Sequence, residues 1–435
     1  MNFFTLFLFL QIVDTIIRFS DEPNELLYIP QRNELFINFR RNNYHMVLDC
    51  STYEIKRIIQ RICGYEGSAY GVFNWKRNKV YFCFNPSPDS IIIIDSNFNT
   101  KVISWRAQSL VYNAWEDKIY SPNGRDIGVI DCFTDSIIKV INSQHYFCGL
   151  PIFDSIGNKV YCGACYSDLL NVIDCKNDSI IKEIHTSISC PSYGVLNKFR
   201  RKAYIGAILF DLNNLPPLIV ISTQYDSMIK TTNIVPYFPF HAMTIRNPII
   251  WNFIEDKIYL VGWVINGNGG IIVVNPYTDS AIKVIPESVQ NMRAWEFLPF
   301  SNRIYFTENI NQIFYLCVLD CSTDSIISKI TLGRKLFDIE VNPKTRQIYI
   351  TDLKDSALYV IKDEVGIVEK KDEREKIKKM NEISNYKEVI VYEITGRRIK
   401  TSCSEKNLEK VLPKGVYYLQ IEGKDKKEML KIVIQ

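Results

Sequence analysis

Short apolar runs separated by polar residues follow one another along most of the chain. A strand-like segment with a nearly invariant aromatic residue recurs, as in NKVYF around Tyr81 and DKIYS around Tyr120. A second apolar segment that ends in an acidic or polar residue follows it, as in GVIDC, and a turn then leads to a third, as in SIIKVI. A looser apolar segment precedes the next aromatic one. Such short runs, bounded by Asn, Asp, Ser, Gly and Pro, predict β-strands, and helical periodicity is nearly absent.

The aromatic segments mark a repeat. Four short strands that recur about every forty residues are typical of a β-propeller blade. The aromatic positions are Phe36, Tyr81, Tyr120, Tyr161, Tyr204, Tyr259, Tyr305 and Tyr349. We therefore expect an all-β fold, a seven- or eight-bladed β-propeller over residues 21–362. The last unit is expected to take its outer strand from the following VGIVEK segment or to lack one.

The segment IDCFTDSIIKVI, from Ile130 to Ile141, is nearly repeated in two other units. Its Asp-Ser pair lies between two strands, where both side chains can bond nearby backbone amides and hold a tight turn. Its cysteine position is filled by serine, threonine or proline in other units, an exchange that a metal ligand would not tolerate. Equivalent positions in different blades are also too far apart for disulfides. We interpret these thiols as small packing residues. They are Cys50, Cys132, Cys175 and Cys321.

These units, with their N-K-V-Y and V-I-D segments, resemble the YVTN or YncE-like β-propeller family over about residues 24–362. Members of that family commonly have seven blades, whereas eight units are recognised here. The resemblance implies the fold and leaves the function open.

The composition changes after Lys362. Residues 363–382 are charged and free of aromatic residues, as expected of a linker. Residues 383–435 are again rich in strand-like segments. Their VYEITGRRI and LPKGVYYLQI stretches resemble the type A sorting domain of the type IX secretion system, through Gly396, Arg397, Gly415 and Tyr417. The resemblance implies a small β-sandwich-like export tag recognised by the secretion machinery. The alternative is a small structural β-domain.

The apolar run from Phe3 to Val13 has the length of a signal-peptide core and is too short to span a membrane. Residues 1–20 are therefore expected to be a signal peptide or an N-terminal apolar segment, with a β-strand or an anchor as the alternative. Together with the C-terminal resemblance, this predicts a protein outside the cell or on the surface of a bacterium with a two-membrane envelope. It would arrive there through the periplasm and would not be an integral membrane protein.

Charge and motifs restrict the chemistry. The net charge is +4 over 435 residues, and no basic block is interleaved with aromatics, so nucleic acid is not an expected partner. The histidines are scattered, and therefore neither a metal site nor a cofactor is expected. No nucleophile elbow, P-loop or dinucleotide fingerprint occurs, and no catalytic residue is assigned. The four histidines are His45, His145, His185 and His241.

Ligands of propellers generally bind at the mouth of the central channel, where the innermost strands and their entering loops supply the contacts. Alignment of the units places a cationic set near one rim, where it can hold an anionic ligand, and solvated loop residues are the alternative. The set is Arg106, His145, His241, Arg293 and Lys335. We expect a non-catalytic binding or scaffold module for a protein, glycan or surface ligand. The alternative is an enzyme, a lactonase-like hydrolase or a carbohydrate-active lyase, that uses the channel mouth.

Overall fold

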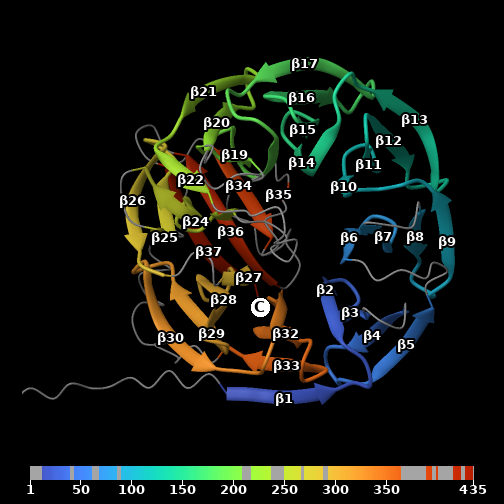
Figure 1. The fold of residues 1–435 in the computed structure, drawn as a ribbon, viewed down its shortest axis with the longest axis vertical. Coiled ribbons are helices and arrows are strands. Elements are labelled where there is room, and N and C mark those ends of the chain that lie inside the picture. The colour runs from blue at the N-terminus through green and yellow to red at the C-terminus, as the bar shows by residue number, and fades with distance from the viewer. Residues whose placement is uncertain are drawn as a thin grey trace, which may run out of the picture.

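The described chain is built entirely from β-strands. The computed structural model describes residues 12–39, 44–60, 68–85, 90–207, 217–236, 249–265, 269–287 and 292–363, together with the backbone of four strands between residues 388 and 434. Eight antiparallel sheets stand around a central axis (Figure 1). The predicted β-propeller is thus confirmed, and it has eight blades.

In each blade, consecutive strands lie side by side, with the first strand nearest the axis and the last at the rim. Blade 1 comprises β2 (Pro23–Ile29), β3 (Glu34–Phe39), β4 (Tyr44–Asp49) and β5 (Ile55–Gln60), and blade 2 comprises β6 (Ser68–Asn74), β7 (Lys79–Asn85), β8 (Ser90–Ile94) and β9 (Thr100–Ser104). Blade 3 comprises β10 (Val111–Asn113), β11 (Lys118–Asn123), β12 (Asp126–Asp131) and β13 (Ser136–Asn142), and blade 4 comprises β14 (Phe147–Asp154), β15 (Lys159–Ala164), β16 (Leu169–Asp174) and β17 (Ser179–His185). Blade 5 comprises β18 (Pro191–Asn197), β19 (Lys202–Ala207), β20 (Ile219–Ser222) and β21 (Ser227–Thr231).

Blade 6 has an inner edge made of two pieces, β22 (Ile234–Pro236) and β23 (Ile249–Asn252), which both pair with β24 (Lys257–Val264). It continues with β25 (Gly269–Asn275) and β26 (Ser280–Ile285). Blade 7 comprises β27 (Met292–Leu298), β28 (Arg303–Ile310), β29 (Ile313–Asp320) and β30 (Ser325–Thr331), and blade 8 begins with β31 (Leu336–Asn342), β32 (Gln347–Asp352) and β33 (Ala357–Lys362).

The outer strand of blade 8 comes from the other end of the chain. β1 (Ile12–Arg18) pairs antiparallel with β33, with Ile16 opposite Tyr359. The expectation that VGIVEK supplies this strand, or that none is present, is therefore wrong. β1 occupies the free edge of β33, which would otherwise expose unpaired backbone groups. The propeller sheet thus begins at residue 12, inside the segment expected to be a signal peptide.

A polar contact that we call the seam staple joins neighbouring blades. In blade 5, Lys202 Nζ lies 2.7 Å from Asp279 Oδ2 of blade 6, and Tyr204 donates its hydroxyl to Asp279 Oδ1 at 2.6 Å. The same lysine, tyrosine and aspartate positions are joined at five successive seams, from blade 2 to blade 7. The five acceptors are Asp135, Asp178, Asp226, Asp279 and Asp324. The repeated tyrosine and the repeated Asp-Ser pair are therefore two halves of one inter-blade contact.

The turn itself is held by a different aspartate from the one expected. Asp131 Oδ1 accepts the backbone N–H of Phe133 at 3.0 Å and of Thr134 at 2.7 Å. Asp135 has a left-handed backbone with φ of 51° and its carboxylate reaches Tyr81 of blade 2. Asp tolerates this backbone conformation better than most residues, so one position both closes the turn and bonds the neighbouring blade.

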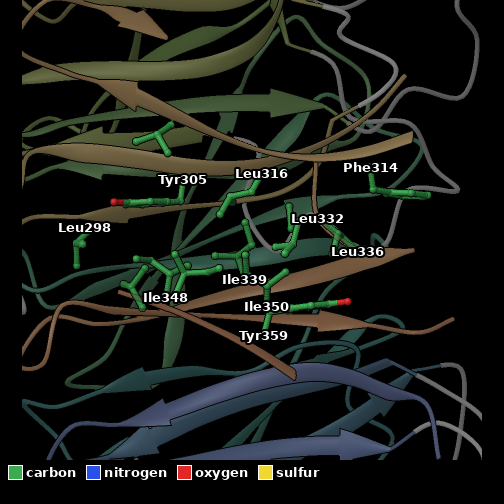
Figure 2. Close-up of a cluster of buried hydrophobic side chains, with 14 of the residues drawn as sticks. Leu298, Tyr305, Phe314, Leu316, Leu332, Leu336, Ile339, Ile348, Ile350 and Tyr359 are labelled. Carbon is green, nitrogen blue, oxygen red and sulfur yellow. The ribbon is translucent and has the colours of Figure 1, made fainter. Parts of the chain in front are cut away.

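The core consists of apolar layers between adjacent blades. The repeated cysteines are buried in these layers without disulfides, as predicted, and burial raises the pKa of Cys132 to about 12. The layer between blades 7 and 8 includes Leu298, Tyr305, Leu316 and Ile350 (Figure 2). Such close packing holds the loops above each seam in place.

The C-terminal strands form a separate four-stranded sheet. β34 (Glu388–Glu393), β35 (Arg398–Ile399), β36 (Gly415–Glu422) and β37 (Lys427–Ile434) pair in the order β35-β34-β36-β37. Gly415 and Tyr417 lie on β36, whereas Gly396, Arg397 and residues 364–387 lie outside the described residues.

Candidate functional site

The predicted cationic set is spread over several blades. Arg106 is exposed in the β9–β10 connection, His145 is half-buried in the β13–β14 connection, and Lys335 is exposed in the β30–β31 connection. Each connection leads from an outer strand to the inner strand of the next blade, so the three lie on the same face of the ring. Arg293 is the second residue of β27 but its side chain is not described, and His241 lies outside the described residues.

A cavity of about 410 Å³ opens beside Lys335 at the seam between blades 7 and 8. The β28–β29 hairpin, the β30–β31 connection and the β32–β33 turn form its walls. Arg106 and His145 do not line it. Its lining residues are Asn309, Gln312, Phe314, Arg334, Lys335, Leu336, Phe337 and Lys354.

The hairpin wall ends in an unusual turn. Asn311 and Gln312 both have positive φ, 51° and 67°. This is the pattern of a two-residue type I′ turn, for which Asn-Gly is the preferred sequence. Glutamine at the second position bears backbone strain that glycine would not. Gln312 lines the cavity, and backbone strain of this kind is concentrated at ligand-binding sites.

A buried carboxylate shapes the basic wall. Asp352 is fully buried, and its Oδ2 accepts the backbone N–H of Arg334 at 2.5 Å and of Lys335 at 3.0 Å. Gly333 has φ of 62°, and a Cβ there would lie 2.1 Å from the same carboxylate oxygen. Only glycine therefore permits this close approach. The result is a tight loop that presents two cationic side chains at the cavity.

The charges around the cavity are incompletely balanced. The Arg334 guanidinium pairs with Asp355. Lys335 and Lys354 have no ion pair to an acidic side chain among the residues that the structure describes. The cavity thus holds two ammonium groups that are available to an anion.

The remaining lining combines amide and apolar groups. Asn309 Oδ1 is buried and accepts no hydrogen bond from any described group. Phe314 is almost fully buried and Phe337 half-buried, and with Leu336 they give the cavity an apolar side. Figure 2 shows Phe314 and Leu336 at one end of the apolar layer, away from Leu298 and Tyr305.

A second polar cluster lies behind the hairpin, on the side facing blade 6. Glu308 is fully buried, and Lys329 Nζ lies 2.6 Å from Glu308 Oε2 and 3.7 Å from Glu287 Oε2. Burial, then the neighbouring Glu308, raises the pKa of Glu287 to about 7. Cys317 Sγ lies 3.9 Å from the Glu308 carboxylate. This cluster fixes the base of the hairpin that carries Asn309.

Sequence reasoning did not find Asn309, Gln312, Lys354 or Glu308. The repeat contained a signal for Glu308, because the equivalent positions of blades 4 and 5 hold the buried residues Ala164 and Ala207. A carboxylate in place of a buried alanine breaks the repeat, and such breaks often mark functional sites.

The fold places the protein in the class of β-propellers. No model of a known protein family matches the sequence, and no curated protein matches it. Solved structures are similar in fold. Hydrazine synthase of Kuenenia stuttgartiensis aligns with a TM-score of 0.49 and 12% identity, over 81% of this chain and 98% of that chain. The β-propeller domain of Cps50 (Swd1) from Myceliophteria thermophila aligns with a TM-score of 0.49 and 11% identity, over 81% of this chain and 99% of that chain.

The strand pairing described above defines the propeller fold. Among the described residues, no group of three or more His, Cys, Asp and Glu residues can hold a metal ion. Nor does that part of the chain contain a helix long and apolar enough to span a membrane.

Proposed function

We propose that this protein is an exported YVTN-like β-propeller that acts as a non-catalytic binding module, with the cavity between blades 7 and 8 as its binding site for an anionic ligand. The main support is the pair Lys335 and Lys354, which lack acidic partners among the described residues and flank a cavity of about 410 Å³. That volume lies within the usual range for small-ligand sites.

The departures from the repeat support the same location. The lysine–tyrosine–aspartate staple is complete at five successive seams and is replaced at the other three, one of which is the seam between blades 7 and 8. There Arg303 Nη1 bonds Asp363 Oδ1 at 2.6 Å. The acidic residues Glu308 and Asp352 occupy the same repeat position in blades 7 and 8, three residues after the repeated tyrosine. These two blades therefore carry specialised polar groups in addition to the contacts that hold the ring together.

The binding proposal is tested by screening small anions with ligand-observed NMR against the full chain. We expect at least one carboxylate, sulfate or phosphate ester to bind, and binding to weaken at least about tenfold in the Lys335→Ala/Lys354→Ala variant. The matched control is Lys139→Ala/Lys176→Ala, which removes the same charge from exposed positions of blades 3 and 4. Equal weakening in both variants would refute the site, because it would show a response to net charge alone.

Export is a separate part of the proposal. Its support is the apolar run from Phe3 to Val13 and the similarity of residues 383–435 to a sorting domain. Since β1 completes blade 8, a cut after residue 20 would remove the strand that closes the ring. We therefore propose that any cleavage of the N-terminal segment falls before residue 12.

Expression in a bacterium that has a type IX secretion system tests this part. We expect the chain on the cell surface, and deletion of residues 383–435 to retain it in the periplasm. Mass spectrometry of the exported N-terminus should find residues 12–18. A surface protein that begins near residue 21, or surface delivery that survives the deletion, would contradict the proposal.

A further inference from the structure

The residues that line the cavity between blades 7 and 8 indicate that its ligand has further features besides a negative charge. We propose that its ligand is an acidic saccharide, a sugar ring that carries a carboxylate, held with the carboxylate toward Lys335 and Lys354. This inference rests on the proposed function, because it assigns a ligand class to the same cavity.

The first observation is an acceptor without a donor. Asn309 lines the cavity, and its Oδ1 is buried and accepts no hydrogen bond from a described group. A buried acceptor left unpaired costs about 1–3 kcal/mol, so a ligand that supplies a donor gains that much in discrimination. Sulfate at neutral pH has no donor, and neither does a simple carboxylate ion. A sugar hydroxyl has one.

The second observation is the division of the lining into polar and apolar sides. Leu336 and Phe337 follow Lys335 directly in sequence, while Asn309 and Gln312 stand on the opposing hairpin. A pyranose ring has the matching character, with an apolar C–H face and hydroxyl groups around its edge. A small inorganic anion would leave Phe337 in contact with water and gain nothing from it.

The third observation is the fixed position of the groups. The loop that carries Lys335 is anchored through its backbone to the buried Asp352, and the hairpin that carries Asn309 is anchored through the neighbouring Glu308 to Lys329. Anchored walls lose little conformational entropy on binding. Moderate affinity for a single sugar unit is therefore attainable.

The experiment is isothermal titration of the full chain with three probes: a galacturonic acid trisaccharide, the neutral galactose trisaccharide and sodium sulfate. We expect the acidic trisaccharide to bind at least about tenfold more tightly than either other probe, which corresponds to about 1.4 kcal/mol. Lys335→Ala/Lys354→Ala should reduce its affinity to that of the neutral sugar. Asn309→Ala should weaken the acidic trisaccharide about fivefold or more and leave sulfate binding unchanged.

The outcomes separate the two proposals. If sulfate binds as tightly as the acidic trisaccharide, and both depend on the lysines, the saccharide inference is wrong and the anion site stands. If Asn309→Ala leaves trisaccharide affinity unchanged, the hydroxyl contact and with it the inference are also wrong. If no anion binds in a lysine-dependent way, both proposals fail. Circular dichroism tests whether each variant is folded. If Asn309→Ala is not folded, Asn309→Ser replaces it in the titrations.

Discussion

The seam staple should contribute measurably to stability, and Asp279→Asn tests its strength. Asparagine tolerates the left-handed backbone, where Asp279 has φ of 52°. The substitution therefore removes the negative charge with little change in the turn. It breaks the ion pair with Lys202, whose Nζ lies 2.9 Å and 2.7 Å from the two carboxylate oxygens, and weakens the 2.6 Å bond from Tyr204.

The magnitude follows from burial. Both charged side chains are mostly buried, 18% and 6% exposed, and hydrogen bonds to charged groups contribute about 1.5–3 kcal/mol each. Lys202 Nζ keeps the carbonyl of Pro276 at 3.0 Å, which offsets part of the loss. We expect Asp279→Asn to lower the free energy of unfolding by about 2 kcal/mol. Asn275→Ala is the control, because the Asn275 side chain accepts the Tyr277 N–H of its own turn and bonds no other blade among the described residues. It should cost about 1 kcal/mol.

Urea unfolding followed by tryptophan fluorescence and by circular dichroism measures these differences, provided that the two transitions coincide. A double-mutant cycle with Tyr204→Phe isolates the contact between the blades and should give a coupling energy of about 1 kcal/mol or more. A coupling below about 0.3 kcal/mol would refute the reasoning, since the tyrosine and the aspartate would then act independently.

Three further predictions concern the ring closure and the cavity. Deletion of residues 1–18 should lower the free energy of unfolding by about 3 kcal/mol or more, because Val13 and Ile17 pack on the core. It should also cause association of the molecules, because it exposes the edge of β33. Calorimetry and light scattering measure the two effects, and a variant that lacks residues 1–11 is the control, which should behave like the intact chain. Gln312→Gly should raise stability by about 0.5–1 kcal/mol by relieving the strained turn, yet weaken ligand binding; a loss of stability in urea would contradict the turn argument. Burial raises the pKa of Glu287 from 4.5 to about 7, so between these pH values the native state keeps a proton that the unfolded state releases. The protonated Glu287 therefore contributes its full stability below about pH 4.5, and this contribution is lost as the pH rises through 7. Unfolding free energies measured across that range should fall by up to about 1.4 kcal/mol per pH unit, and Glu287→Gln should remove this slope; an unchanged slope would assign it to other groups.

The sequence predicted the blades well because each blade is a local structure. Strand periodicity, turn residues and the repeated tyrosine lie within about forty residues of one another, and neighbouring segments pair along the chain. The burial of Cys132 was also predictable, since an exchangeable position in an apolar run indicates packing. The cavity was predictable only through Lys335. The other residues of its wall look like ordinary hairpin residues until two blades stand side by side.

The Asp-Ser motif shows where local reasoning stops. Its spacing correctly indicated a turn, but the partner of Asp135 is Tyr81 of another blade, at a distance in sequence that no local pattern reveals. The ring closure shows the same limit more strongly. An apolar N-terminal segment is compatible with an export signal and with a strand, and the choice depends on whether a free sheet edge is nearby in space.

By itself, the sequence determined the class of fold, the repeat and the residues that make each blade cohere, because those properties depend on short-range pairing and on burial of alternating side chains. Tertiary structure decided which strand completes blade 8, which aspartate joins neighbouring blades, and where cations without acidic partners meet a buried acceptor. These features arise when the ring closes and brings residue 16 beside residue 359, a contact between chain ends whose position only the geometry of all eight blades can set.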